Sequence, residues 1–296
     1  MIRANGEIIR FATRDGLLLD GFLMPSRKHD LCVVHIHGMT GNFYGGGLQF
    51  AMASYLNKNG IALFTINTRG HDAVSSAYRT ASRIKRSRKK RLRIGTNLER
   101  FEDCVFDIDG AIKELRRLGY KRIILSAHST GCQKITYYQY KKSSDFVKGL
   151  ILLAPANDYD LNKAALGSRF NRVVNRCRKM VKQGKGNSTE GIPSGFSARR
   201  FLSVADLKNV EARLFNYNGP LKEVSRINAP ILAMFGSMDP SAPKPTRKYM
   251  EILKSRRGTN QFQYALIRGA RHSFEKHGDD VARIASKWAA ERLGKA

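Results

Sequence analysis

Ser129 occupies a short run of small residues that is typical of a catalytic nucleophile. It lies in the sequence Ala-His-Ser-Thr-Gly (residues 127–131), directly after the apolar run 123–125 and before a stretch expected to be helical. A serine hydroxyl is a poor nucleophile at neutral pH, so a hydrolase exposes it on a tight strand-to-helix turn where a base can reach it. The usual pattern is Gly-x-Ser-x-Gly, and here Ala127 replaces the first glycine while Gly131 keeps the last. The departure at Ala127 concerns the geometry of the turn rather than its existence.

A second turn, upstream of Ser129, could stabilise the negative charge that develops when a carbonyl group is attacked. The apolar run 31–36 ends in His-Gly-Met-Thr-Gly, residues 37–41. Backbone N–H groups must point at the oxygen that becomes negative, and a neighbouring glycine lets the main chain approach closely. This logic predicts an oxyanion hole made by the backbone N–H groups of Met39 and Thr130.

Two loops near the end of the chain offer an acid and a base. Asp239 follows the apolar run 231–236, and His272 follows the run 262–267. Asp158 and Asp160 are rivals for the acid, because they follow another apolar run and some hydrolases place the acid there. A Gly-Ser-x-Asp turn after the penultimate strand is the commoner arrangement, which favours Asp239.

The remaining histidines have simpler interpretations. His277 competes with His272 but lies where a C-terminal helix is expected to begin, so it is expected to face solvent. His128 is expected to point away from the nucleophile and to pack beside the turn. His35 and His37 are interpreted as core or loop histidines satisfied by hydrogen bonds, because no third ligand recurs nearby to complete a metal site.

Taken together, these motifs resemble the α/β-hydrolase superfamily, from roughly the first strand to the last helix. Besides the turns already described, Asn-Thr-Arg-Gly-His-Asp (residues 67–72) looks like the Arg-Gly-His loop of these enzymes and follows the apolar run 61–66. The resemblance implies that Ser129 is the nucleophile, Asp239 the acid and His272 the base.

The segment 95–131 is similar to that of serine esterases, lipase-like monoacylglycerol hydrolases and feruloyl-esterase-like proteins, which share the triad and differ in substrate. Dehalogenases and epoxide hydrolases of this fold use an aspartate nucleophile, and Ser129 argues against both.

The implied chemistry is hydrolysis of carboxylic esters through an acyl-enzyme intermediate, with no cofactor and with a small-molecule substrate. His272 would accept the proton of Ser129, and Asp239 would fix the imidazole tautomer. Thioesterase, lactonase, peptidase and acyltransferase activities share the same covalent step. The alternative from another class is a noncatalytic protein that binds nucleic acid or another polyanion on a hydrolase scaffold.

Short apolar runs alternate with helical stretches, which predicts an α/β fold with a mainly parallel central sheet and helices on both faces. The first runs, 7–12 and 17–24, are expected to form an antiparallel hairpin around Asp15 and Gly16. Thr-Asn-Leu-Glu (residues 96–99) reads as a capping box, so a helix is expected to begin at Thr96.

One region, 161–224, has few strand signals and is expected to be a cap over the site. Residues 1–160 and 225–296 then form the α/β-hydrolase core. Four aromatic side chains of the cap region could line a substrate pocket or simply pack the cap onto the sheet: Phe170, Phe196, Phe201 and Tyr217.

The composition fits a folded enzyme located in the cytoplasm. The chain has 296 residues, of which 42% are hydrophobic, so it can form a substantial core. The first residues lack an apolar signal region, and nowhere do eighteen apolar residues run together. The cysteines show no Cys-x-x-Cys spacing and are expected to be buried free thiols, in keeping with a reducing compartment; they are Cys32, Cys104, Cys132 and Cys177.

The unusual property is charge, because 53 Lys and Arg residues outnumber 24 Asp and Glu residues, for a formal net charge of +29. Two basic clusters stand out: Arg83, Lys85, Arg86, Arg88, Lys89, Lys90, Arg91 and Arg93, and then Arg169, Arg172, Arg176, Arg178, Lys179, Lys182 and Lys185. Such clusters could make nonspecific contact with a polyanion. A solvated basic face is the favoured interpretation over dedicated nucleic-acid binding, because no interleaved aromatics, helix-turn-helix or zinc spacing accompany the charge.

Overall fold

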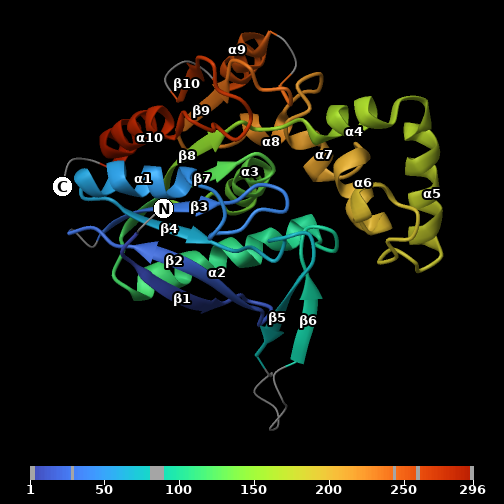
Figure 1. Cartoon of the computed structure of the whole chain (residues 1–296), viewed down its shortest axis with the longest axis horizontal. Coiled ribbons are helices and arrows are strands. Elements are labelled where there is room, and N and C mark those ends of the chain that lie inside the picture. The colour runs from blue at the N-terminus through green and yellow to red at the C-terminus, as the bar shows by residue number, and fades with distance from the viewer. Residues whose placement is uncertain (1–3, 28–29, 81–89, 243–244, 258–260, 294–296) are drawn as a thin grey trace.

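An eight-stranded sheet forms the centre of the protein (Figure 1). The computed structural model describes residues 4–27, 30–80, 90–242, 245–257 and 261–293. The strand order is β1-β2-β4-β3-β7-β8-β9-β10; β2 is antiparallel to both of its neighbours and all other pairs are parallel. The strands are β1 (Glu7–Ala12), β2 (Leu18–Met24), β3 (Leu31–Ile36), β4 (Ala62–Ile66), β7 (Arg122–His128), β8 (Val147–Leu153), β9 (Ile231–Gly236) and β10 (Phe262–Ile267). The predicted fold class and the predicted first hairpin are therefore confirmed.

Helices cover both faces of the sheet and bury it. Helices α1 (Leu48–Lys58) and α10 (Gly278–Leu293) pack on one face, and α2 (Cys104–Arg117), α3 (Gly131–Lys142) and α9 (Thr246–Arg257) pack on the other (Figure 1). Because successive side chains of a strand point to opposite faces, each central strand serves two cores and reads as a continuous apolar run.

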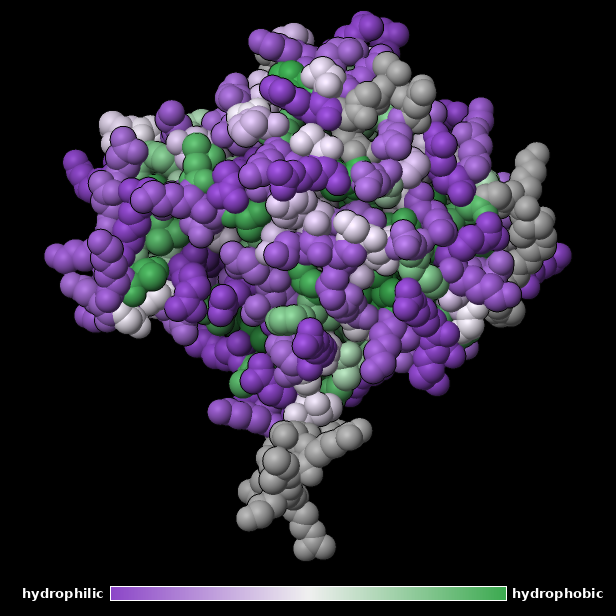
Figure 2. All heavy atoms as spheres, turned by 180° about the vertical axis from the view of Figure 1, so that it is seen from behind, coloured by the Kyte–Doolittle hydropathy of each residue, from purple (hydrophilic) through white to green (hydrophobic). Residues whose placement is uncertain are grey.

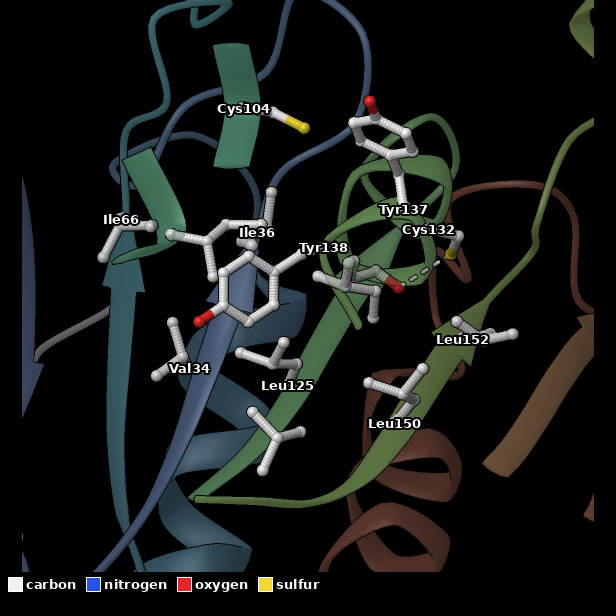
Figure 3. Packing of buried hydrophobic residues seen from close by; sticks show 14 of the residues in the cluster. Val34, Ile36, Ile66, Cys104, Leu125, Cys132, Tyr137, Tyr138, Leu150 and Leu152 are labelled. Atoms are coloured by element: carbon white, nitrogen blue, oxygen red, sulfur yellow. Dashed lines mark hydrogen bonds between the residues drawn. The ribbon is translucent and has the colours of Figure 1, made fainter. Parts of the chain in front are cut away.

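The larger core shows this alternation directly. Val34 and Ile36 of β3, Leu125 of β7 and Leu150 of β8 lie side by side beneath Tyr138 of α3 (Figure 3). Leu31 and Val33 of β3 belong to the other core, on the side of α1 and α10. The central strands are thereby fixed in position, and their carboxyl ends carry the loops of the candidate site.

The expected helix start at Thr96 is wrong. A 3-10 turn at Phe101–Asp103 leads into α2, which begins at Cys104. The Thr96 hydroxyl donates to the backbone oxygen of Gly70 at 2.6 Å and accepts from the backbone N–H of Thr40 at 2.9 Å. The capping-box residues are therefore committed to contacts with distant loops, and these contacts prevail over the local capping pattern.

The chain between β8 and β9 is helical and contains no strand. It forms α4 (Asp158–Leu166), α5 (Phe170–Lys182), α6 (Ala198–Ala205), α7 (Val210–Leu214) and α8 (Lys222–Ser225), and α5 lies at the outer edge of the molecule (Figure 1). Phe170, Phe196 and Phe201 pack together in a small core of this region. Tyr217 joins the main core and donates its hydroxyl to the oxygen of Pro155 at 2.9 Å. The four aromatic side chains are thus packing residues. The division of the chain into a hydrolase core and a cap at residues 161–224 stays a prediction.

A two-stranded antiparallel ribbon, β5 (Ser75–Arg79) and β6 (Lys90–Ile94), stands apart from the main sheet (Figure 1). It contains the end of the first basic cluster: Lys90, Arg91 and Arg93 lie on β6. The other members of that cluster lie outside the described residues: Arg83, Lys85, Arg86, Arg88 and Lys89.

Three further findings concern the described part of the chain. No helix there is long and apolar enough to cross a membrane. Its four cysteines are buried free thiols, as predicted. It contains no cluster of three or more side chains that could hold a metal ion.

Candidate active site

Ser129 lies on a strained turn between β7 and α3. Its backbone has φ +53°, a left-handed conformation that is unfavourable for a residue with a side chain. The turn is held by hydrogen bonds on both sides: the N–H of Ser129 donates to the oxygen of Leu153 at 2.8 Å, and its carbonyl accepts from the N–H of Cys132 at 2.9 Å. The sharp strand-to-helix turn predicted from residues 127–131 is therefore present.

The two ends of the motif differ in how much room they leave. Ala127 is buried within β7 and does not have a positive φ, so its methyl group is accommodated. A Cβ atom on Gly131, in contrast, would lie 2.6 Å from the backbone oxygen of His37 and 2.8 Å from that of Ile36. This close approach requires glycine at position 131, whereas position 127 accommodates alanine. Cys132 secures the start of α3 through a bond from its Sγ to the oxygen of Ala127, 3.2 Å long (Figure 3).

The structure brings Ser129, His272 and Asp239 together. The Nε2 atom of His272 lies 2.9 Å from Ser129 Oγ, and its Nδ1 atom lies 2.9 Å from Asp239 Oδ2. An ionised carboxylate only accepts, so Nδ1 carries the proton and Nε2 is the acceptor for the serine hydroxyl. Burial alone would raise the pKa of Asp239, but the hydrogen bond and charge of His272, with the N–H of Ser241, lower it.

The rival acids lie elsewhere. Asp158 is buried at the start of α4 and accepts from Nε2 of Gln133 at 2.7 Å. Burial, assisted by the charge of Glu211, raises the pKa of Asp158 to about 7. Asp160 accepts from the side-chain amide of Asn157 at 2.7 Å. Of the three candidate acids, Asp239 is the one hydrogen-bonded to the imidazole of His272.

Of the other histidines, His128 has a contact that sequence reasoning did not find. Its Nε2 atom donates to the backbone oxygen of His272 at 2.9 Å, and the two rings lie 4.9 Å apart. His128 therefore supports the loop that carries the imidazole. His277 is partnered by Asp280, at 3.6 Å. His35 is satisfied at Nδ1 by Ser126, at 3.1 Å.

The two predicted oxyanion donors are unoccupied by the protein itself. Among the described residues, no acceptor takes a hydrogen bond from the backbone N–H of Met39 or of Thr130. The neighbouring N–H of Thr40 is used by Thr96. A Cβ atom on Gly38 would lie 3.1 Å from Ser129 Cβ, so the His-Gly turn rests directly against the serine. Neither N–H group is therefore used by another part of the described structure, and their role as oxyanion donors stays a prediction.

The Arg-Gly-His loop is anchored by Arg69. Its guanidinium binds Asp107 of α2 at 2.8 Å and also pairs with Asp103 and Asp15. The backbone N–H of Arg69 donates to Asp107 as well, at 2.8 Å. This cluster fixes the loop on α2.

A cavity of about 360 Å³ adjoins these elements. Its wall includes the direct neighbours of three candidate site residues: Gly38, His128 and Ser273. Most of its other lining is polar or glycine, from the segment between β3 and α1. This volume is at the small end of the range for small-molecule sites.

Solved structures with this fold include esterases and other hydrolases. Est1E from Butyrivibrio proteoclasticus is 17% identical, with 98% of this chain and 99% of that chain covered and a TM-score of 0.62. The siderophore hydrolase EstB from Aspergillus fumigatus is 13% identical, with coverage of 99% and 98% and a TM-score of 0.70. A soluble variant of monoglyceride lipase from Saccharomyces cerevisiae is 16% identical, with coverage of 99% and 97% and a TM-score of 0.61.

No curated protein matches the chain by sequence. The model of one protein family, described as "Protein of unknown function (DUF1749)", matches residues 97–294. That match extends over more than half of the chain and includes all three residues that meet at the turn. The chain therefore belongs to the DUF1749 family, and it has the α/β-hydrolase fold of these solved structures.

Proposed function

We propose that this protein is a serine hydrolase that cleaves carboxylic esters. The observation that carries the proposal is the unbroken line of hydrogen bonds from Ser129 Oγ through His272 to Asp239, with 2.9 Å at each step. In this mechanism His272 takes the proton of Ser129 as the serine attacks the ester carbonyl, and Asp239 stabilises the imidazolium. The N–H groups of Met39 and Thr130 bind the developing oxyanion.

The first half of the reaction ends when the imidazolium gives its proton to the leaving alcohol, and the acyl group stays on Ser129 as an ester. In the second half, His272 removes a proton from water, which attacks the carbonyl of the acyl-enzyme. The bond to Ser129 Oγ then breaks, the imidazolium returns the proton to that oxygen, and the carboxylic acid is released. Thioesterase and acyltransferase activities are the alternatives within this proposal, because an acyl-enzyme can also form from a thioester and can also react with an acceptor other than water. Adding a competing alcohol or thiol acceptor and measuring how much acyl group it receives separates hydrolysis from acyl transfer.

The test is hydrolysis of short p-nitrophenyl esters by the purified chain and by Ser129→Ala. We expect kcat to fall at least about 10⁴-fold in the variant, because the covalent step is lost. A fluorophosphonate probe should label the unsubstituted protein and not Ser129→Ala. Turnover by Ser129→Ala at the original rate would place the nucleophile elsewhere.

The two histidines near the C-terminus provide a matched pair. We expect His272→Asn to lose activity as severely as Ser129→Ala and His277→Asn to keep it, because His277 pairs with Asp280 rather than with the serine. Circular dichroism of both variants checks that they remain folded. Equal losses at the two positions would contradict the assignment of the base.

A noncatalytic role in polyanion binding is the second candidate. It is favoured by the exposed basic residues of α5, a helix that lies at the outer edge of the molecule (Figure 1). Polyanion binding would use other residues than the proposed ester hydrolysis. Measuring the affinity for a polyanion as the salt concentration rises tests this role separately.

A further inference from the structure

A buried lysine lies behind the proposed oxyanion hole. Lys134 is on α3, and its side chain is 3% exposed. Its Nζ atom lies 2.8 Å from Oε2 of Glu99 and donates to Oγ1 of Thr68 at 3.1 Å. A lysine is seldom buried so completely, and burying its charge requires a partner such as Glu99.

The contacts continue from Lys134 to the His-Gly turn. Thr68 Oγ1 lies 3.1 Å from Nε2 of His37, and the backbone N–H of Thr68 donates to the same nitrogen at 3.2 Å. The other nitrogen of His37, Nδ1, lies 2.8 Å from the backbone oxygen of Gly38. Lys134 is thus linked to Gly38 by three successive hydrogen bonds.

The direction of each bond is determined by its two ends. A lysine ammonium can only donate, and a carbonyl oxygen can only accept. Lys134 therefore donates to Thr68, the Thr68 hydroxyl donates to Nε2 of His37, and Nδ1–H of His37 donates to Gly38. This requires a neutral imidazole, in agreement with burial, assisted by the charge of Lys134, lowering the pKa of His37 to about 3.

The last bond acts on the oxyanion hole itself. The carbonyl of Gly38 and the N–H of Met39 belong to one planar, trans peptide group, so they cannot rotate independently. Whatever fixes the Gly38 oxygen also fixes the direction of the Met39 N–H. Two groups hold that oxygen: His37, and the backbone N–H of Gly41 at 3.1 Å.

The other end of the chain of contacts is in the helical region between β8 and β9. Oε1 of Glu99 lies 3.4 Å from Nη2 of Arg200, a fully buried residue of α6. Arg200 also pairs with Glu211 of α7 and donates from Nε to the oxygen of Thr96 at 3.0 Å. The Glu99 carboxylate occupies the space above Gly70, where a Cβ atom would lie 2.0 Å from it.

We propose that Lys134 and Thr68 are positioning residues of the oxyanion hole, and that Glu99 and Arg200 tie their placement to the docking of helices α6 and α7. The kinetic part of this inference rests on the proposed function. A buried ion pair is weak evidence for a stabilising role, and the role that we assign to the pairs of Glu99 is to fix geometry.

The decisive variant is Thr68→Val, which removes the linking hydroxyl and keeps the shape of the side chain. We expect kcat for p-nitrophenyl butyrate to fall about ten-fold, a part of the 10²–10³-fold loss caused by removing an oxyanion donor entirely. KM should change less than about two-fold, since the oxyanion forms only after binding. Affinity for a trifluoromethyl ketone, which forms an oxyanion on the serine, should fall by the same factor as kcat.

Two further substitutions control for structural damage. Thr136→Val makes the same change on α3 at a buried hydroxyl with no hydrogen-bond partner in the described structure, and it should leave kcat unchanged. Thr68→Ser restores the hydroxyl and should recover most of the activity. Equal kcat values for Thr68→Val and Thr136→Val would overturn the positioning role.

A measurement that does not need activity separates this inference from the proposed function. In ¹⁵N-labelled protein, the amide signal of Met39 should shift in Thr68→Val and not in Thr136→Val, and the imidazole of His37 should show the Nδ1–H tautomer. An unmoved Met39 amide would refute the inference even if the protein is an esterase. A shifted amide in a protein that hydrolyses no ester would refute the proposed function alone.

The link to the helical region is tested by a double-mutant cycle. Arg200→Lys keeps the charge but loses the fork that reaches Glu99 and Glu211 together. We expect it to lower kcat several-fold alone, and to have no further effect in the Thr68→Val background because the connection is already broken. Independent, multiplicative losses would show that Arg200 does not act through Thr68.

Discussion

Asp239 and Asp158 are two buried carboxyl groups near His272, and their surroundings move their pKa values in opposite directions. Burial would raise both, but hydrogen bonds from His272 and Ser241 lower the pKa of Asp239, whereas the pKa of Asp158 is raised to about 7. Asp239 thus stays ionised at neutral pH and can stabilise an imidazolium. Asp158 is a poor choice for that task, because burial raises its pKa and favours the neutral form.

Asparagine substitutions should therefore have unequal effects on catalysis. Asp239→Asn is expected to lower kcat about 10⁴-fold, because an amide no longer enforces the imidazole tautomer that the serine needs. Asp158→Asn should keep kcat within a few-fold, since its side chain bonds Gln133 rather than the ring. Steady-state kinetics at pH 8 on both variants make the comparison. A larger loss at Asp158 would move the acid to α4.

The raised pKa of Asp158 also has a consequence for stability. Between about pH 4 and pH 7 the folded protein holds a proton at Asp158 that the unfolded chain has released, so the free energy of unfolding falls as the pH rises through this window. Asp158→Asn removes that cost and should increase the free energy of unfolding at pH 8, by an amount on the order of a few kcal/mol.

Urea unfolding from pH 4 to pH 8 measures this effect, with Asp145→Asn as the exposed control. The Asp158→Asn profile should be flatter than that of the unsubstituted protein, and the control profile should be parallel to it. If Asp158→Asn also follows a parallel profile, folding does not raise the pKa of the Asp158 carboxyl group.

At the scale of elements, the first residue of α3 is confined by the end of β3. A Cβ atom on Gly131 would meet the backbone oxygens of His37 and Ile36 at 2.6 and 2.8 Å, and backbone atoms cannot swing aside as a side chain does. Gly131→Ala is expected to lower the free energy of unfolding by about 1–3 kcal/mol and to displace the His-Gly turn, with loss of kcat. Thermal unfolding and ester hydrolysis report the two effects.

Gly278→Ala provides the control, because Gly278 is the first residue of α10 and the nearest atom to its added Cβ would be Ala51 Cβ at an ordinary 3.6 Å. This variant should be as stable as the unsubstituted protein and equally active. If the two alanine variants behave alike, the close approach of α3 to β3 is not a constraint on the site.

The elements that could be predicted are those whose pattern is local. A strand buried on both faces forms a continuous apolar run, so β9 could be read from the run 231–236, which matches it at both ends. The run 262–267 likewise matches both ends of β10, although β10 is an edge strand and is only partly buried. The motif around Ser129 likewise indicated its turn, and the order of Ser129, Asp239 and His272 in the chain led to three side chains that do meet. Their catalytic roles stay predictions until they are assayed.

The features that could not be predicted depend on partners far away in sequence. Thr96 resembles a helix cap, but its hydroxyl binds Gly70 and Thr40. Lys134 gave no signal beyond a charge among apolar positions of a buried helix, since its partners Thr68 and Glu99 come from other loops. Local patterns contain no information on such contacts, and the fold alone brings them together.

For the molecule as a whole, charge is the property most in need of an explanation. The face shown in Figure 2 is largely hydrophilic, with only small hydrophobic areas between polar side chains. Between Asp160 and Glu190 the sequence contains no acidic residue, and α5 presents exposed basic side chains along its outer surface. Arg172, Lys179 and Lys182 are exposed, at spacings that place them on neighbouring turns of one helix face. A surface of this kind attracts polyanions by releasing condensed counterions, without reading sequence.

We therefore expect the protein to bind duplex DNA weakly and without sequence preference, and to lose this binding as salt rises. Replacing Arg172, Lys179 and Lys182 together by glutamine should reduce the slope of log K against log salt by about 2–3, if each residue neutralises one phosphate. The same three changes at Lys121, Lys148 and Lys222, which are exposed but dispersed, should reduce it less. Fluorescence anisotropy at salt concentrations from 50 to 300 mM measures both slopes; over this range the Debye length shortens from roughly 14 Å to roughly 6 Å.

Equal slopes in the two triple variants would mean that the charge acts as a diffuse field over the molecule and that α5 is a solvated basic face. Ester hydrolysis should be the same in both, since none of the six residues contacts the proposed site.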